Sequence, residues 1–165
     1  SLSGAAFDGV GGTPASERLF AMFLDRLRTA AAPGVDGGAL LAAALRATLL
    51  DAMQLSSACG ASEPSYLNVA VSDGSSAAVS RYTTDDPSGA DSLYVHTGRR
   101  YTGEDGVCRM LEPLSGQETV LVSSERLSDD PGWQSVPVNH IVVVHDGRVT
   151  RFEPVGDAPS EPCRA

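Results

Sequence analysis

The stretch HIVVVHDGRVTRFE, residues 140–153, decides the fold class of this sequence. Its first part, His140–His145, holds four apolar residues between two histidines. A short apolar run of this kind, enriched in β-branched residues, predicts a buried strand. Asp146-Gly147 favours a tight two-residue hairpin, so we expect Arg148–Glu153 to return as a second, antiparallel strand.

Further strands are expected upstream, because the apolar pattern beyond Pro64 has a period of two. Asp73-Gly74 predicts a turn between the first two of these strands. The expected strands are Tyr66–Val71, Ala77–Tyr82, Ser92–His96 and Glu118–Ser123.

Two helices are expected before the strands. Thr13 and Pro14 fit the N-cap and first position of a helix that runs to about residue 30 and carries Leu19, Phe20, Phe23, Leu24 and Leu27 on one face. A second helix, Gly38–Ala58, places Leu41, Leu45, Leu49, Ala52 and Leu55 on its buried stripe.

Two helices followed by about six strands, mostly linked by hairpins, predict an α+β fold with a mostly antiparallel sheet. Residues 1–12 are rich in glycine and alanine and are expected to form a flexible loop. The segment 156–165 contains Pro159 and Pro162 and is expected to be a disordered tail. We find no internal repeat and no sign of a second domain.

Charge and composition exclude several functions. The 165 residues carry a net charge of −9, and all 12 basic residues are arginine. Nucleic acids and anionic membranes require clustered positive charge, so neither is expected as a partner. The longest low-charge stretch, 39–58, is interrupted by Arg46 and Asp51, so it does not read as a membrane span. Three cysteines without metal-type spacing favour a reduced, cytoplasmic protein that has no metal and no other cofactor.

No catalytic residue can be assigned from the residues alone. The histidines have no carboxylate or thiol at metal-ligand spacing, so we interpret them as structural or surface residues, with a catalytic role as the alternative. The cysteines lack a neighbouring base and are interpreted as inert thiols. Ser1 could act as an N-terminal nucleophile, but the glycines that follow it lack strand character. The residues considered are His96, His140, His145, Cys59, Cys108, Cys163 and Ser1.

Several segments resemble, in order and spacing, the C-terminal half of a class II glutamine amidotransferase domain. Residues 12–20, GTPASERLF, resemble the start of a helix that reads Gly-Thr-Thr-Asp-Ser-Glu in that family. Residues 123–127, SSERL, resemble its Ala-Ser-Glu-Pro-Leu segment. The other matching segments are Leu67-Asn68, Asp73-Gly74, Ser80–Tyr82, Ser92–Tyr94, Trp133, Pro137, Asn139 and His140. The branch concerned includes glutathione-degrading and ergothioneine-pathway amidotransferases.

The resemblance implies that residues 13–155 form part of an αββα sandwich of the N-terminal-nucleophile hydrolase fold. It also implies cleavage of γ-glutamyl amide bonds in small molecules. In the family an N-terminal cysteine attacks the γ-carbonyl, an Asn-Gly pair stabilises the oxyanion and an arginine holds the substrate carboxylate. All of these precede the matched part, so this chain alone is expected to be inactive and to need the missing N-terminal half or a partner subunit.

One family site is expected inside this chain, at the helix start formed by Thr13, Ala15 and Ser16. The family has an aspartate there that receives the substrate's α-ammonium, and the aligned residue is Ala15. Alanine cannot make that charge-assisted bond, which contributes about 1.5–3 kcal/mol. As an alternative, Asp8 could supply the carboxylate if the loop that contains it folds back toward the helix start.

Two hypotheses of function remain. The chain is one segment of a γ-glutamyl amidotransferase with its catalytic half elsewhere, or it is a degenerate amidotransferase-like domain that serves binding or assembly. A third reading is an unrelated α+β binding module. If a half is missing, one sheet face should lack part of its cover, at Val69, Val71, Val120, Val142 and Val144.

Overall fold

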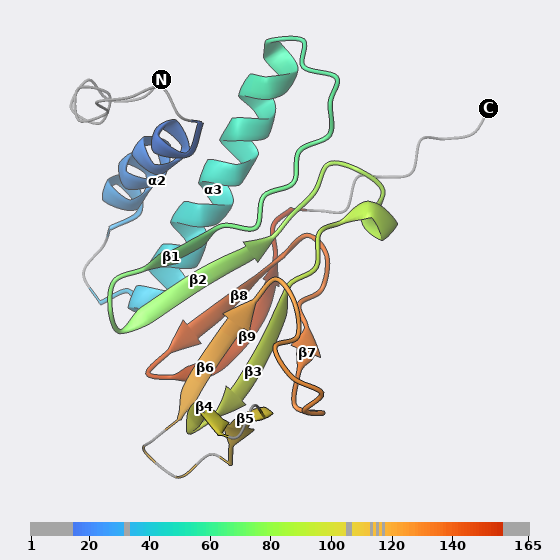
Figure 1. The fold of residues 1–165 in the computed structure, drawn as a ribbon. Helices are drawn as coiled ribbons and strands as arrows, with labels where there is room; N and C mark the ends of the chain where they lie inside the picture. The colour runs from blue at the N-terminus through green and yellow to red at the C-terminus, as the bar shows by residue number, and fades with distance from the viewer. Residues whose placement is uncertain are drawn as a thin grey trace.

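The computed structural model describes residues 15–31, 34–104, 107–112, 114, 116 and 118–156. Two helices come first, α2 (Ala15–Ala30) and α3 (Gly37–Ala58), and they pack side by side (Figure 1). Asp36 caps α3, where its Oδ1 accepts a 2.8 Å hydrogen bond from the Ala39 amide. The first twelve residues, Thr13 and Pro14, and the tail from residue 157 lie outside the described residues.

The strands form two larger sheets and a separate hairpin, and every pairing is antiparallel. The four-stranded sheet has the order β1-β2-β8-β9 and the three-stranded sheet the order β6-β3-β7. The bounds are β1 Ala70–Ser72, β2 Ser76–Arg81, β3 Tyr94–Gly98, β4 Arg100–Glu104, β5 Val107–Leu111, β6 Thr119–Ser123, β7 Gln134–Ser135, β8 His140–His145 and β9 Arg148–Pro154. A short 3-10 helix, Pro87–Gly89, lies between β2 and β3.

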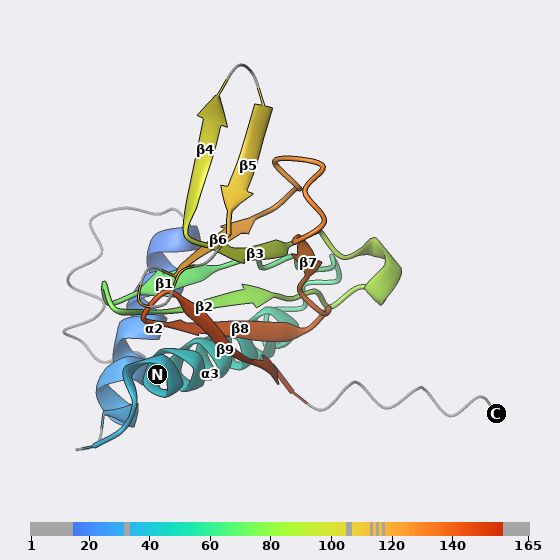
Figure 2. The ribbon, with the colours of Figure 1, turned by 90° about the horizontal axis from the view of Figure 1, so that it is seen from below.

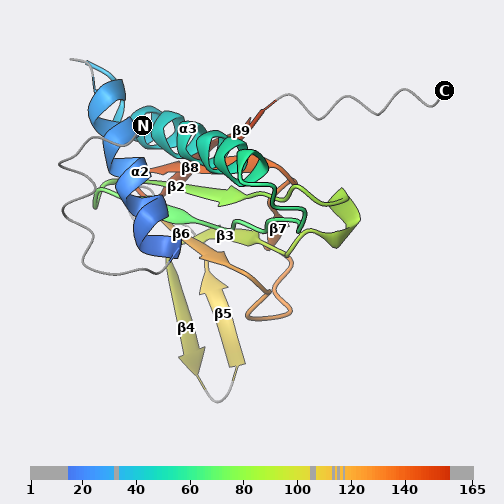
Figure 3. The same ribbon diagram turned by 90° about the horizontal axis from the view of Figure 1, so that it is seen from above.

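The described elements stack as three layers, seen from the side in Figure 2. The two helices cover one face of the four-stranded sheet, and the three-stranded sheet packs on its other face. The β4–β5 hairpin projects away from both sheets, as Figure 3 also shows. The predicted α+β class, with two helices before a mostly antiparallel sheet, is confirmed.

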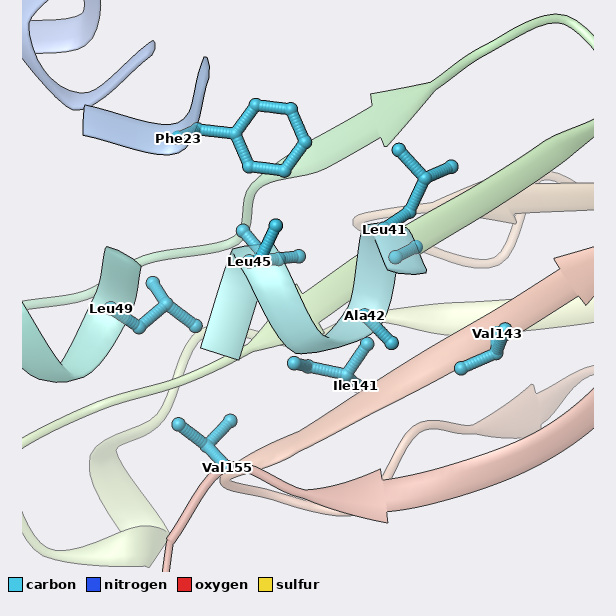
Figure 4. Close-up of a cluster of buried hydrophobic side chains, with 10 residues drawn as sticks. Phe23, Leu41, Ala42, Leu45, Leu49, Ile141, Val143 and Val155 are labelled. Atoms are coloured by element: carbon cyan, nitrogen blue, oxygen red, sulfur yellow. The ribbon is translucent and has the colours of Figure 1, made fainter. Parts of the chain in front are cut away.

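The first core lies between the helices and the four-stranded sheet (Figure 4). Leu41, Leu45 and Leu49 of α3 belong to one buried cluster with Ile141 and Val143 of β8, and Ala42 points toward Ile141. By length and composition α3 could cross a membrane, but its apolar stripe is the centre of this core. Leu55 departs from the predicted stripe, because it is 56% exposed beyond the last residues that meet the sheet.

The second core lies between the two sheets. Val79 and Val142 point into it from the four-stranded sheet, and Val95 meets them from β3. The expectation of an uncovered sheet face is therefore wrong for Val142, which is fully buried. The four other valines of that expectation are half-buried.

The strand prediction missed the β4–β5 hairpin and overestimated the first strand. Residues 66–69 pair irregularly with β2 and the residues just after it, through a single bridge from Tyr66 to Thr83 and isolated hydrogen bonds, so the regular ladder of β1 begins at Ala70. The hairpin projects from the sheets, and its base meets β3, where Met110 is buried.

Candidate functional site

The helix start identified from sequence is an exposed surface. Ala15 is the first residue of α2, and both Ala15 and Ser16 are exposed. Glu17 lies in the first turn, where the helix dipole favours negative charge. Thr13 lies outside the described residues. The two described site residues are thus adjacent and accessible, and a side chain placed at Ala15 would face solvent.

A serine–histidine pair joins the start of β2 to the end of β8. Ser76 Oγ lies 2.8 Å from His145 Nδ1, and His145 Nε2 lies 3.3 Å from Asp146 Oδ2. The nearby Asp73 accepts hydrogen bonds from the amides of Ser76 and Ser75, which lower the pKa of its carboxyl. The triad-like arrangement was not expected from sequence, because Ser76 and His145 meet only through the β2–β8 register.

This pair is poorly placed for nucleophilic attack. Ser76 is only 2% exposed, so its hydroxyl has little access to a substrate carbonyl. A serine nucleophile needs an open approach beside oxyanion donors. We therefore assign Ser76 and His145 a structural role, which is to fasten two strand ends beneath the first turn of α3.

A second polar cluster lies on the outer side of β3. His96 is 5% exposed, and its Nε2 lies 3.1 Å from Asp130 Oδ1. The Trp133 ring stands edge-on to the imidazole at 5.2 Å between centroids. The Gly132 amide, followed in strength by His96, lowers the pKa of Asp130. This cluster holds the loop before β7 against the sheet, in agreement with a structural reading of His96.

Arg81 fastens two further loops to the end of β2. Its guanidinium donates hydrogen bonds of 2.7 Å to the Asp91 and Val136 carbonyls, and it also reaches Ser135 Oγ at 3.2 Å. Asp91 lies before β3, Ser135 is the last residue of β7 and Val136 follows it. One side chain thus joins both sheets at this end of the molecule.

The described residues contain no evident metal site, and their cysteine thiols are exposed. Among them, no group of three or more histidine, cysteine, aspartate or glutamate residues is arranged to bind a metal ion. Cys59 and Cys108 are free and exposed, and Cys163 lies outside the described part of the chain. The exposed start of α2 therefore remains the candidate site.

Comparison with known proteins places this geometry in context. Two solved structures superimpose with a TM-score of 0.57 each. One is a glutamine aminotransferase class-II domain protein of Silicibacter pomeroyi, 23% identical, and the match covers 87% of this chain and 53% of that one. The fold is glutamine amidotransferase-like. The other is described as a predicted glutamine amidotransferase of Pseudomonas aeruginosa, 19% identical, with coverage of 86% and 51%.

A curated relative agrees with this assignment of the amidotransferase-like fold. Over 84 residues, 50% of the chain, the sequence is 38% identical to the probable glutamine amidotransferase DUG3 of Saccharomyces cerevisiae. That match spans 24% of the relative, and the chain spans about half of each solved structure. No family model matches the sequence.

Proposed function

We propose that this chain is one part of a class II, N-terminal-nucleophile amidotransferase domain that cleaves γ-glutamyl amide bonds. The observation that carries the proposal is the glutamine amidotransferase-like fold, combined with 38% identity to a probable glutamine amidotransferase over half of the chain. The nucleophile, the oxyanion donors and the arginine for the substrate carboxylate would come from a part of the protein outside this sequence. The matched structures are about twice as long as their matched part, which supports this division.

In this proposal the start of α2 binds the γ-glutamyl substrate. Thr13, Ala15 and Ser16 stand where the resembled family receives the α-ammonium group. Ala15 and Ser16 are exposed on the first turn of α2, so a substrate can reach them. Ala15 has no carboxylate, and the domain should therefore bind free α-amines weakly.

A second candidate function is a non-catalytic amidotransferase-like domain for binding or assembly. Ala15 favours it, because the residue aligned with the family's aspartate cannot pair with an ammonium group. The buried Ser76 hydroxyl and the two exposed, free cysteines are compatible with it as well. In either case we propose a reduced, cytoplasmic setting and no nucleic-acid or membrane partner, on the basis of unpaired thiols and a net charge of −9.

The proposed function predicts that the 165-residue chain alone has no γ-glutamyl hydrolase activity, whereas the native protein has it. The test is turnover of glutamine and of a γ-glutamyl anilide by both, together with the intact mass and N-terminal sequence of the native protein. Turnover by the isolated chain that is lost on replacing one of its own residues would contradict the proposal. A longer native protein that folds but turns over neither substrate would favour the binding function.

Restoring the carboxylate should strengthen substrate binding. In the active native protein, Ala15→Asp is expected to lower KM for γ-glutamyl substrates with a free α-amine by about tenfold, which corresponds to about 1.4 kcal/mol. The position is exposed at the helix start, where the dipole favours negative charge. Ala15→Asn, of similar size but neutral, is the matched control and should give little gain. Equal gains for free and α-acetylated substrates would show that Ala15 is not at the ammonium site.

A further inference from the structure

A cavity lies at the base of the β4–β5 hairpin, where β3 ends and β6 begins. It has a volume of about 560 Å³, and its described lining residues are Arg99, Arg100, Leu111, Glu118 and Thr119. Figure 1 shows the hairpin base toward the opposite end of the molecule from the start of α2. The cavity is therefore separate from the candidate site described above.

A bend in the chain brings both arginines to this one cavity. Consecutive residues of a regular strand point to opposite faces of a sheet. Arg99 lies in a bend between β3, which ends at Gly98, and β4, which begins at Arg100, so the alternation is interrupted there. The Arg99 backbone is held on both sides, because its amide donates a 2.9 Å hydrogen bond to the Leu111 carbonyl and its carbonyl accepts a 3.0 Å hydrogen bond from Thr119 Oγ1. Two arginines thus border one pre-formed space.

The carboxylate among the described lining residues is already paired with another arginine. Glu118 Oε1 accepts a 2.6 Å hydrogen bond from the Arg148 guanidinium at the start of β9. The backbone amide of Glu118 and, next in strength, this bond hold the pKa of its carboxyl below the usual value, so the group is ionised at neutral pH. Among the described residues, neither Arg99 nor Arg100 forms an ion pair. The surroundings of the cavity thus hold three arginines for one carboxylate.

Such a local excess of positive charge runs against the composition of the chain. Acidic residues outnumber arginines by 21 to 12. Elsewhere arginines are paired within the fold, as Arg26 is with Asp51, and as Arg46 and Arg151 are with Glu153. Two neighbouring arginines without an acidic partner in the described part of an acidic chain indicate that the counter-charge comes from a ligand.

We propose that this cavity binds a small molecule through an oxyanion group, a carboxylate or a phosphate, which Arg99 and Arg100 hold. The planar guanidinium group presents donors that match either oxyanion in bidentate geometry. Leu111, which is half-buried at the same cavity, offers an apolar contact for the carbon part of the ligand. This site is independent of the proposed function, because it uses neither the start of α2 nor a catalytic group outside this sequence.

The test is isothermal titration calorimetry of the native protein with inorganic phosphate and with malonate. The ionic strength is held constant, because added salt screens exposed charges. Saturable binding is expected, and the anion that binds more tightly identifies the recognised group as phosphate or carboxylate. Arg99→Gln and Arg100→Gln should each weaken this binding by at least about tenfold, as expected for the loss of a charge-assisted hydrogen bond. Arg28→Gln, at an exposed arginine in the last turn of α2, is the matched control and should leave the affinity unchanged.

The outcomes separate this site from the proposed function. Binding of neither anion to the native protein would overturn the site and leave γ-glutamyl cleavage untouched. Equal weakening by Arg28→Gln would show that only the overall charge matters, and binding that survives both cavity variants would place the anion elsewhere, so either result would also overturn it. An unchanged urea midpoint of unfolding verifies that each variant is folded. Loss of the proposed function, shown by a native protein without γ-glutamyl turnover, would leave this site intact.

Discussion

Replacing Leu45 by alanine is expected to lower the free energy of unfolding by about 3 kcal/mol, as for other fully buried leucines. Leu45 is completely inaccessible in the core between α3 and the four-stranded sheet. Leu45 lies between Phe23 of α2 and Ile141 of β8 (Figure 4). Two layers therefore contact the same side chain, and neither can move inward to fill the cavity without losing other contacts.

Leu55→Ala on the same helix is the matched control. Leu55 is 56% exposed, so its truncation should change stability by no more than about 0.5 kcal/mol. Urea unfolding of the 165-residue chain, followed by circular dichroism, measures both variants. Similar losses at the two positions would mean that α3 does not pack on the sheet as described.

The contrast between Leu45 and Leu55 shows what helical periodicity can predict. The spacing correctly identifies the side of α3 that faces the core, and Leu41, Leu45 and Leu49 are all buried. Periodicity says nothing about where the opposing sheet ends. The last part of α3 extends beyond the core, so Leu55 follows the pattern but remains exposed.

The polar clusters could not have been predicted from sequence, because each depends on long-range pairing. Ser76 meets His145, 69 positions away, only when β2 and β8 pair in register. Arg81 reaches the Val136 carbonyl across 55 positions. The start of α2 is different, since a local motif marks it, and the roles of Ala15 and Ser16 there stay a prediction.

Gly98→Ala is expected to lower the free energy of unfolding by a similar amount. Here the cause is overpacking rather than a cavity. A β-carbon added at Gly98 would lie 2.0 Å from Met110 Cγ and 2.5 Å from the Leu111 carbonyl oxygen. Met110 can rotate away, but the Leu111 carbonyl belongs to the backbone and is held by the Arg99 amide at 2.9 Å. Relief therefore requires β3 to separate from the base of the β4–β5 hairpin. We expect a loss of about 3 kcal/mol, at the upper end of the usual overpacking cost.

Gly103→Ala in β4 provides the control for this prediction, because the same substitution there meets little resistance. A β-carbon at Gly103 would come no closer than 3.4 Å to any neighbour, the nearest being Cys108 Sγ, which is ordinary contact. Alanine restricts the unfolded backbone more than glycine does, so Gly103→Ala should be neutral or stabilise the chain by up to about 1 kcal/mol. Relative to the original chain, the urea midpoint of unfolding should therefore fall for Gly98→Ala and stay the same or rise for Gly103→Ala. A Gly98→Ala variant as stable as the original chain would show that the hairpin base is not packed on β3, and the attachment of β4 and β5 to this sheet would be wrong.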